Sequence, residues 1–248
     1  MLSRRRLLKL ACTAPMAGRS LGQSSRSAVP PAEIRQLVSF RFAPGKTAEA
    51  IASFRDQALP LYEENPAMLR FRGFREVESP IPVDLILVST FHGMAGMDES
   101  NDRLRTLADA AGTSIGAIYG HIGALSIGHY DEFVRMLGPR AEAATGSRLV
   151  LLEYVELVSE SVDTVERLVI DELTPWEREA HILESSESGR VLIGSGWHYV
   201  RFLGIDRLAA IEDHLSAVRS QSFYRRLAPS IRRVQRVVLA TVPELSVR

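Results

Sequence analysis

The chain has 248 residues, of which 46% are hydrophobic and 24% are charged, as in an ordinary globular protein with a packed core. Thirty basic residues balance thirty acidic ones, but residues 1–22 hold five basic residues and no acidic one, which leaves 25 basic against 30 acidic residues in the remainder. An acidic protein is a poor partner for nucleic acid, because non-specific binding depends on neutralising phosphate charge. Cys12, the only cysteine, lies in the same N-terminal stretch, which excludes disulfides and cysteine sites from residues 23–248.

The N-terminal stretch has the parts of an export signal. Residues 3–9, Ser-Arg-Arg-Arg-Leu-Leu-Lys, resemble the twin-arginine motif, with leucine in place of the usual phenylalanine, and an apolar stretch and a small-residue site ending at Gly22 follow. We expect residues 1–31 to be a signal segment and linker, and the protein to be periplasmic or secreted. The alternative is a basic tail on a cytoplasmic protein. The apolar stretch falls far short of the ~20 residues that span a bilayer, so stable membrane insertion is not expected.

The rest of the chain contains a self-similarity at an offset of 114 residues. It aligns a strand and the helix that follows it, and an aromatic residue beside an acid at the helix end is the match least expected from chance. The matching pairs include Leu37 and Leu151, Phe40 and Tyr154, Phe54 and Leu168, Tyr62 and Trp176, and Glu63 and Glu177. A repeat of this kind indicates two copies of one supersecondary unit.

In chain order, the first half is predicted to be β-α-β-β-α-β. Residues 34–42 alternate between apolar and polar side chains, as a half-buried strand does. Thr47 can cap a helix with apolar residues at helical spacing. The later elements are strands over 69–77 and 83–91, a helix over 101–111 and a strand over 129–137.

The second half repeats this order. Its strands are predicted over 149–158, 191–195, 198–203 and 234–242, and its helices over 162–180 and 208–218. This order is the ferredoxin-like split motif, whose sheet has helices on one face only and therefore needs a partner for the other face. We expect an α+β protein in which two tandem ferredoxin-like halves, 32–140 and 147–248, cover each other as a barrel-like body.

Two stretches resemble the NIPSNAP family. Phe42 to Lys46 through Leu59 to Glu63 resembles that family's first strand and helix, and residues 222–243 resemble its last helix and strand. NIPSNAP-like proteins belong to the dimeric α/β-barrel group, together with stress-responsive A/B barrels and antibiotic-biosynthesis monooxygenases. The resemblance implies an intramolecular dimeric α/β-barrel-type body and supplies no catalytic signature that can be transferred residue by residue.

Four residues are the candidate catalytic residues: His198, His92, Tyr154 and Tyr130. The histidines lie in or at the ends of predicted strands, where they could face a cavity between the sheets. Histidine is the side chain whose ordinary pKa lies near neutral pH, and a nearby phenol could polarise a carbonyl group. The alternative is that these residues make local hydrogen bonds at strand ends.

Metal and cofactor sites are not expected. The histidine spacings typical of metal sites are absent from the sequence. His121 and His214 fall in or near predicted helices, and some haem-binding α/β barrels use a helical histidine as the axial ligand. Nothing around either residue supports a haem pocket, so we expect solvated or packed helix histidines.

The segment Gly112 to Gly128 contains five glycines and no charged residue. It is interpreted either as a flexible lid or cavity wall, or as a helix that packs closely against a neighbour through its glycines. Each glycine inside a helix costs about 1 kcal/mol relative to alanine, so such a composition needs a reason.

Three functions remain open. The first is an exported, NIPSNAP-like small-molecule-binding or accessory protein, without a defined cofactor. The second is a cofactor-independent monooxygenase or cyclase that acts on an aromatic or polyketide-like compound in the inter-sheet cavity. The third is a structural or interaction module, and a homo-oligomer is compatible with all three. A pocket lined by histidine and tyrosine would favour the enzyme, an arginine-rich pocket an anion binder, and a filled core an interaction module.

Overall fold

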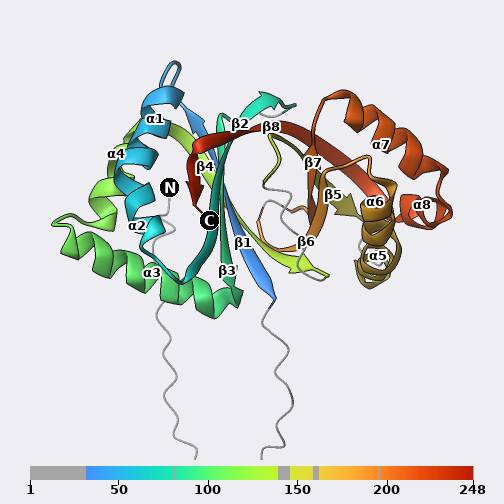
Figure 1. The fold of residues 1–248 in the computed structure, drawn as a ribbon, viewed down its shortest axis with the longest axis horizontal. Coiled ribbons are helices and arrows are strands. Elements are labelled where there is room, and N and C mark those ends of the chain that lie inside the picture. The colour runs from blue at the N-terminus through green and yellow to red at the C-terminus, as the bar shows by residue number, and fades with distance from the viewer. Residues whose placement is uncertain (1–31, 81, 139–145, 159–161, 195, 248) are drawn as a thin grey trace, which may run out of the picture. The chain divides into compact units, whose positions relative to one another are not determined.

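The computed structural model describes residues 32–80, 82–138, 146–158, 162–194 and 196–247 (Figure 1). The expected signal segment and linker, residues 1–31, therefore lie outside the described residues. In the described residues, no helix is long and apolar enough to cross a membrane.

The first half has the order β-α-β-β-α-β, with each helical region divided into shorter helices. Its elements are β1 (Glu33–Phe42), α1 (Thr47–Ser53), a π-helical turn (Phe54–Ala58), α2 (Leu59–Glu63), β2 (Met68–Glu78), β3 (Leu85–His92), α3 (Gly93–Ala110), α4 (Ile115–Leu125) and β4 (Ser126–Leu137).

The second half has the same order. Its elements are β5 (Leu149–Leu157), α5 (Val162–Leu168), a π-helical turn (Val169–Leu173), α6 (Thr174–Ala180), β6 (Ser185–Ile193), β7 (Tyr199–Ile205), α7 (Ala209–Ser220), α8 (Ser222–Leu227), a 3-10 turn (Ala228–Ser230) and β8 (Ile231–Val247). The predicted strand over 191–195 is wrong in position, because β6 begins at Ser185 and ends at Ile193.

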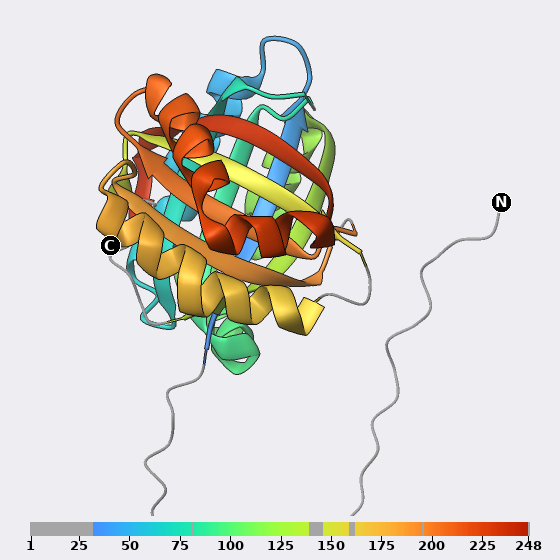
Figure 2. The ribbon, with the colours of Figure 1, turned by 90° about the vertical axis from the view of Figure 1, so that its right-hand side faces the viewer.

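All eight strands close into one antiparallel barrel in the order β1-β3-β2-β8-β5-β7-β6-β4. Each half supplies four neighbouring strands, and the halves join through the pairs β2–β8 and β4–β6. The helices of the first half cover one side of the barrel and those of the second half cover the other (Figures 1 and 2). The predicted fold class, two tandem ferredoxin-like halves in one barrel, is confirmed, and residues 31–248 form one compact unit.

Both faces of each sheet are buried, one inside the barrel and one under helices. On β1, Leu37 belongs to the barrel interior, whereas Val38 and Phe40 pack under the first-half helices. Arg35 also points inward, where Nη2 lies 2.7 Å from a carboxylate oxygen of Glu187. Closing the barrel therefore buries Arg35 and Ser39 on the polar side of this strand, whereas Arg41 near its end is exposed.

The predicted offset of 114 residues is wrong by one residue over the first strand and helix. The two π-helical turns start 115 residues apart, at 54 and 169. Phe40 lies under helices, whereas Tyr154 lies inside the barrel, so the two do not occupy equivalent places. A slip of one residue moves every side chain of a strand to the opposite face, which explains why the alignment paired residues from different environments.

The glycines of the α4 segment do not pack against a neighbour. A side-chain carbon added at Gly120 or Gly123 would have no atom within 4 Å outside the helix. The helix instead buries Ile118, Ile122 and Leu125 in the first-half core. The interpretation of a closely packed glycine face is therefore wrong, since the glycines lie on the exposed side of α4.

Candidate functional site

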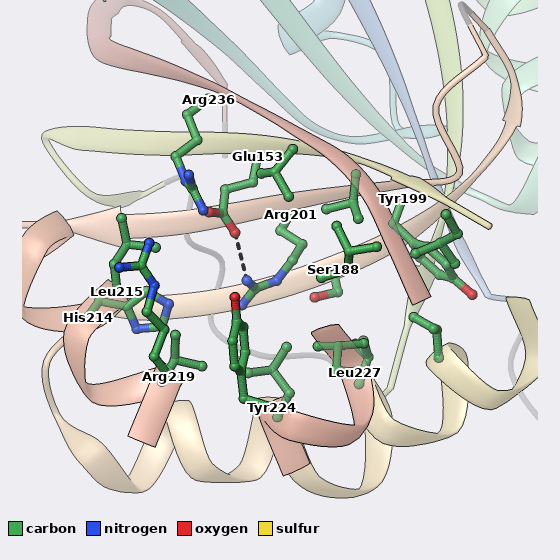
Figure 3. A pocket seen from close by; sticks show the side chains of 18 residues that line it. Glu153, Ser188, Tyr199, Arg201, His214, Leu215, Arg219, Tyr224, Leu227 and Arg236 are labelled. Atoms are coloured by element: carbon green, nitrogen blue, oxygen red, sulfur yellow. Dashed lines mark hydrogen bonds and ion pairs between the residues drawn. The ribbon is translucent and has the colours of Figure 1, made fainter. Parts of the chain in front are cut away.

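A pocket of about 80 Å³ lies between the second-half sheet and its helix layer (Figure 3). Most of its wall is apolar, with β5, β8, α5 and α8 contributing Val155, Val234, Val165 and Leu227. Polar side chains enter from the sheet on one side and from α7 and α8 on the other. The combination of an apolar wall and a few convergent polar groups is typical of small-molecule sites.

The floor of the pocket is a row of side chains that crosses four neighbouring strands. In the strand register, Arg236 of β8 lies opposite Glu153 of β5, Glu153 lies opposite Arg201 of β7, and Arg201 lies opposite Ser188 of β6. Arg236 Nε donates to Glu153 Oε1 at 2.6 Å, and Arg201 Nη1 donates to Glu153 Oε2 at 2.7 Å. The charges alternate along this row, which ends at the uncharged serine.

A second carboxylate reaches this row from the helix layer. Glu177 of α6 accepts hydrogen bonds from Arg201 Nη2 and from the Ser186 hydroxyl. His214 of α7 places Nε2 3.2 Å from Oε1 of the same carboxylate. Burial alone would raise the pKa of Glu177, but the charge of Arg201 and the contact with His214 outweigh it and lower that pKa to about 2. Glu177 is therefore a buried carboxylate that stays ionised at neutral pH.

Four buried polar atoms of the residues that line this pocket have no hydrogen-bond partner among the described residues. They are Arg201 Nε, Ser188 Oγ, and His214 Nδ1 and Nε2, of which Nε2 lies 3.2 Å from the Glu177 carboxylate. The exposed fractions of Arg201, Ser188 and His214 are 9%, 2% and 1%. A buried polar group without a partner costs about 1–3 kcal/mol, so such a cluster in one small pocket indicates a bound molecule or ordered water that supplies the missing bonds.

The corresponding space in the first half is filled by aromatic side chains. Tyr62 packs on Phe71 with ring centroids 4.7 Å apart, and its hydroxyl meets that of Tyr119. Burial raises the pKa of Tyr62 well above its ordinary value, so this phenol stays neutral. With an offset of 115 residues, Tyr62 of the first half corresponds to Glu177 of the second half. The first half therefore has a neutral phenol where the second half has an ionised carboxylate.

The structure brings two of the four predicted catalytic residues together. Tyr154 and Tyr130 lie on the inner side of the barrel, close to Glu132 and Ser39. Burial, followed by the charge of Glu132, raises the pKa of Tyr154 well above its ordinary value, and burial also raises that of Tyr130. Both phenols are therefore neutral hydrogen-bonding groups at neutral pH.

The two predicted catalytic histidines lie at or next to strand ends. His198 precedes β7, and its Nδ1 accepts a hydrogen bond from the Leu157 backbone N–H at 3.1 Å. His92 ends β3 at an exposed position opposite Glu33 on β1. Tyr130 lies opposite Ser39, which is six residues beyond Glu33 on β1. About 20 Å of strand therefore separates Tyr130 from His92. The four residues do not form one constellation, and a catalytic role for any of them stays a prediction.

The described residues do not fit a haem. His214 is buried, with one ring nitrogen against the Glu177 carboxylate and its ring 6.0 Å from that of Trp176. A pocket of about 80 Å³ is much smaller than the ~300 Å³ or more of typical ligand sites. His121, the other helical histidine, lies on the exposed side of α4. In the described ranges, no three histidine, cysteine or acidic residues form a group that could hold a metal ion.

Sequence reasoning missed the row of Glu153, Arg201 and Ser188, and it treated His214 as an ordinary helix residue. One signal could have found the charged pair. Glu153 lies at the centre of β5 with apolar residues on both sides, and Arg201 is the one charged residue of β7. An isolated charge in a buried strand requires a partner, so a pair of opposite charges on two such strands predicts a buried ion pair.

Solved structures with the same fold include proteins described as enzymes. A proposed monooxygenase from Fusobacterium nucleatum subsp. nucleatum has a TM-score of 0.59 at 8% identity, covering 85% of this chain and 93% of that one. A proposed monooxygenase from Lactobacillus acidophilus NCFM has a TM-score of 0.55 at 12% identity, covering 87% and 98%. Chlorite dismutase from Candidatus Nitrospira defluvii, in complex with imidazole, has a TM-score of 0.54 at 9% identity, covering 86% and 92%.

These similarities establish the fold alone, because the identities are so low. The chain has the dimeric α/β-barrel fold, with both ferredoxin-like halves in a single polypeptide. No protein-family model matches the chain, and no curated protein matches it in sequence.

Proposed function

We propose that this protein binds a small molecule in the pocket between the second-half sheet and its helices. The observation that carries this proposal is the set of buried polar atoms, Arg201 Nε, Ser188 Oγ and the ring nitrogens of His214, that line an apolar pocket without hydrogen-bond partners among the described residues. A ligand with one polar end can bond to Arg201 Nε and Ser188 Oγ and cover the apolar wall. We also propose that the protein is related to NIPSNAP-like proteins. Residues 222–243, which resemble that family, contribute to the wall of the pocket.

Filling the pocket is expected to abolish binding. Val234→Phe places a larger apolar side chain in the wall, at a half-buried position where the fold can accommodate it. Val77→Phe is the matched control, because Val77 is 50% exposed on β2 and lies outside the pocket. Ligand-observed NMR with isobutyrate, isobutyramide and isobutanol should detect binding to the wild type and to Val77→Phe, and at least tenfold weaker binding to Val234→Phe. Equal binding by all three proteins, or none by the wild type, would contradict the proposal.

A cofactor-independent enzyme, the monooxygenase or cyclase considered above, is a second candidate. It is favoured by the His214–Glu177 pair, in which Nε2 of a buried imidazole lies 3.2 Å from a carboxylate and Nδ1 has no hydrogen-bond partner among the described residues. The pocket is smaller than an aromatic or polyketide-like substrate requires. Oxygen uptake or product formation from a compound that binds, reduced at least a hundredfold in His214→Gln, would support catalysis. Absence of turnover with every compound that binds would leave the binding function alone.

Export is the remaining part of the proposal, and it rests on the twin-arginine pattern of residues 3–9. Arg4 and Arg5 are the pair that such a signal requires. Cell fractionation of a variant with Arg4→Lys and Arg5→Lys should find the protein retained in the cytoplasm. Export at the wild-type level in that variant would remove the twin-arginine assignment.

A further inference from the structure

We infer that the ligand of this pocket is a short-chain monocarboxylate, whose carboxylate lies against Arg201 and Ser188 and whose apolar body lies toward Val155 and Leu227. This inference deepens the proposed function and rests on it. It names the chemical class of the ligand, which the fold leaves open. Charge, hydrogen bonding and size each support it.

The charge of the pocket favours an anion. Three arginines line it, Arg201, Arg219 and Arg236, against one lining carboxylate, Glu153. Glu177 lies directly behind the lining and adds a second negative charge, so these arginines and carboxylates carry a formal excess of one positive charge, to which the exposed Arg219 contributes. A monocarboxylate cancels this excess, whereas a primary ammonium group would double it in a buried site.

Two of the unpartnered atoms, Arg201 Nε and Ser188 Oγ, favour a ligand group that accepts hydrogen bonds. Arg201 Nη1 donates to Glu153 and Nη2 donates to Glu177, whereas Nε has no partner in the described residues. Ser188 lies directly opposite Arg201 in the strand register, and the Tyr224 hydroxyl points toward the guanidinium (Figure 3). Arg201 Nε–H and the Ser188 hydroxyl can both donate to one carboxylate.

A neutral amide of the same shape fits this pattern less well. It has one accepting oxygen, and its NH₂ group adds two donors at the donor-rich end of the pocket. An inorganic anion such as phosphate would satisfy the donors, but it would leave the apolar wall of the pocket uncovered. The apolar wall and the donor pair therefore point together to a molecule with one carboxylate and a compact hydrocarbon body.

The volume of the pocket limits the hydrocarbon body. About 80 Å³ is roughly half the ~150 Å³ of an engineered cavity that accepts benzene. This size corresponds to an acid with about three to five carbons, which is smaller than benzoate.

The test compares isobutyrate with matched molecules by isothermal titration calorimetry at pH 7 on the purified full chain. Isobutyrate is expected to bind at least tenfold more tightly than isobutyramide, and isobutylamine, benzoate and phosphate are expected not to compete. Equal affinity for the acid and the amide would overturn the inference. Tighter binding of phosphate or of benzoate than of isobutyrate would also overturn it.

The Ser188 hydroxyl provides a variant that leaves the ion pairs intact. Ser188→Ala should weaken isobutyrate binding three- to tenfold, whereas Ser39→Ala, at a buried strand serine of the barrel interior, should leave it unchanged. An unchanged affinity in Ser188→Ala would contradict the assigned position of the carboxylate.

The outcomes separate this inference from the proposed function. If acid and amide bind equally and Val234→Phe abolishes both, the pocket binds small molecules but does not select a carboxylate. If none of the probes binds the wild type, both the inference and the proposed function fail.

Discussion

Replacing Arg201 by methionine is expected to lower the free energy of unfolding by about 3–5 kcal/mol. Arg201 is the central cation of the buried row, with Glu153 on one side and Glu177 on the other. Methionine fills similar space but removes the positive charge, so Glu177 loses its main charged partner and Glu153 keeps only Arg236. The loss is large because a buried charge without a partner keeps its desolvation cost and gains nothing in return.

Urea unfolding of the two proteins measures this loss. The matched control is Arg226→Met, which removes an arginine from an ion pair with Glu172 whose side chains are 55% and 36% exposed. Because solvent screens that pair, the control should lose about 0–1 kcal/mol. A loss in Arg201→Met no greater than in the control would show that the buried row is not formed as described.

The wild-type protein is expected to lose about 3 kcal/mol of stability through Glu177 alone as the pH falls from about 4.5 to about 2. Burial raises the pKa of this carboxyl, but Arg201 and His214 outweigh it, so that the folded-state pKa is about 2 against the ordinary 4.5. A lowered folded-state pKa stabilises the folded protein above the unfolded-state pKa. The stabilisation is lost as pH falls toward the folded-state pKa, because the carboxyl must then be protonated.

The comparison of the wild type with Glu177→Gln isolates this contribution. Urea unfolding at several pH values should show the wild type more stable at pH 6, with the difference shrinking steadily below pH 4.5. Glu172→Gln, at the exposed ion pair with Arg226, is the control and should follow the wild type closely. A wild-type advantage over Glu177→Gln that stays constant down to pH 2 would contradict the lowered pKa.

The fold was predictable because its elements are long and strongly patterned. The apolar alternation of residues 34–42 and the helix that follows identify the β-α-β-β-α-β unit, and the unit recurs once. The exact register was not predictable in the same way. Apolar residues such as Leu151 and Leu152 are adjacent, so a strand buried on both faces matches equally well at two offsets.

The pocket was not predictable because its residues meet only through the strand register and the helix layer. Glu153, Ser188 and Arg201 are separated by many residues in the chain, and they become neighbours when β7 pairs between β5 and β6. His214 and Glu177 come from different helices. Reasoning from residue type favoured His198, whose imidazole instead binds a backbone N–H at the end of β5.

The most direct test of the central claim, that the second-half pocket binds the ligand, is methyl NMR of the protein titrated with isobutyrate. Chemical shift changes are expected for the methyl groups of Val155, Val165, Leu227 and Val234, which line the pocket. The methyl groups of Ile118 and Ile122, in the first-half core, should not shift. Shifts confined to the first half or to the barrel interior, or no shifts at saturating isobutyrate, would contradict the account.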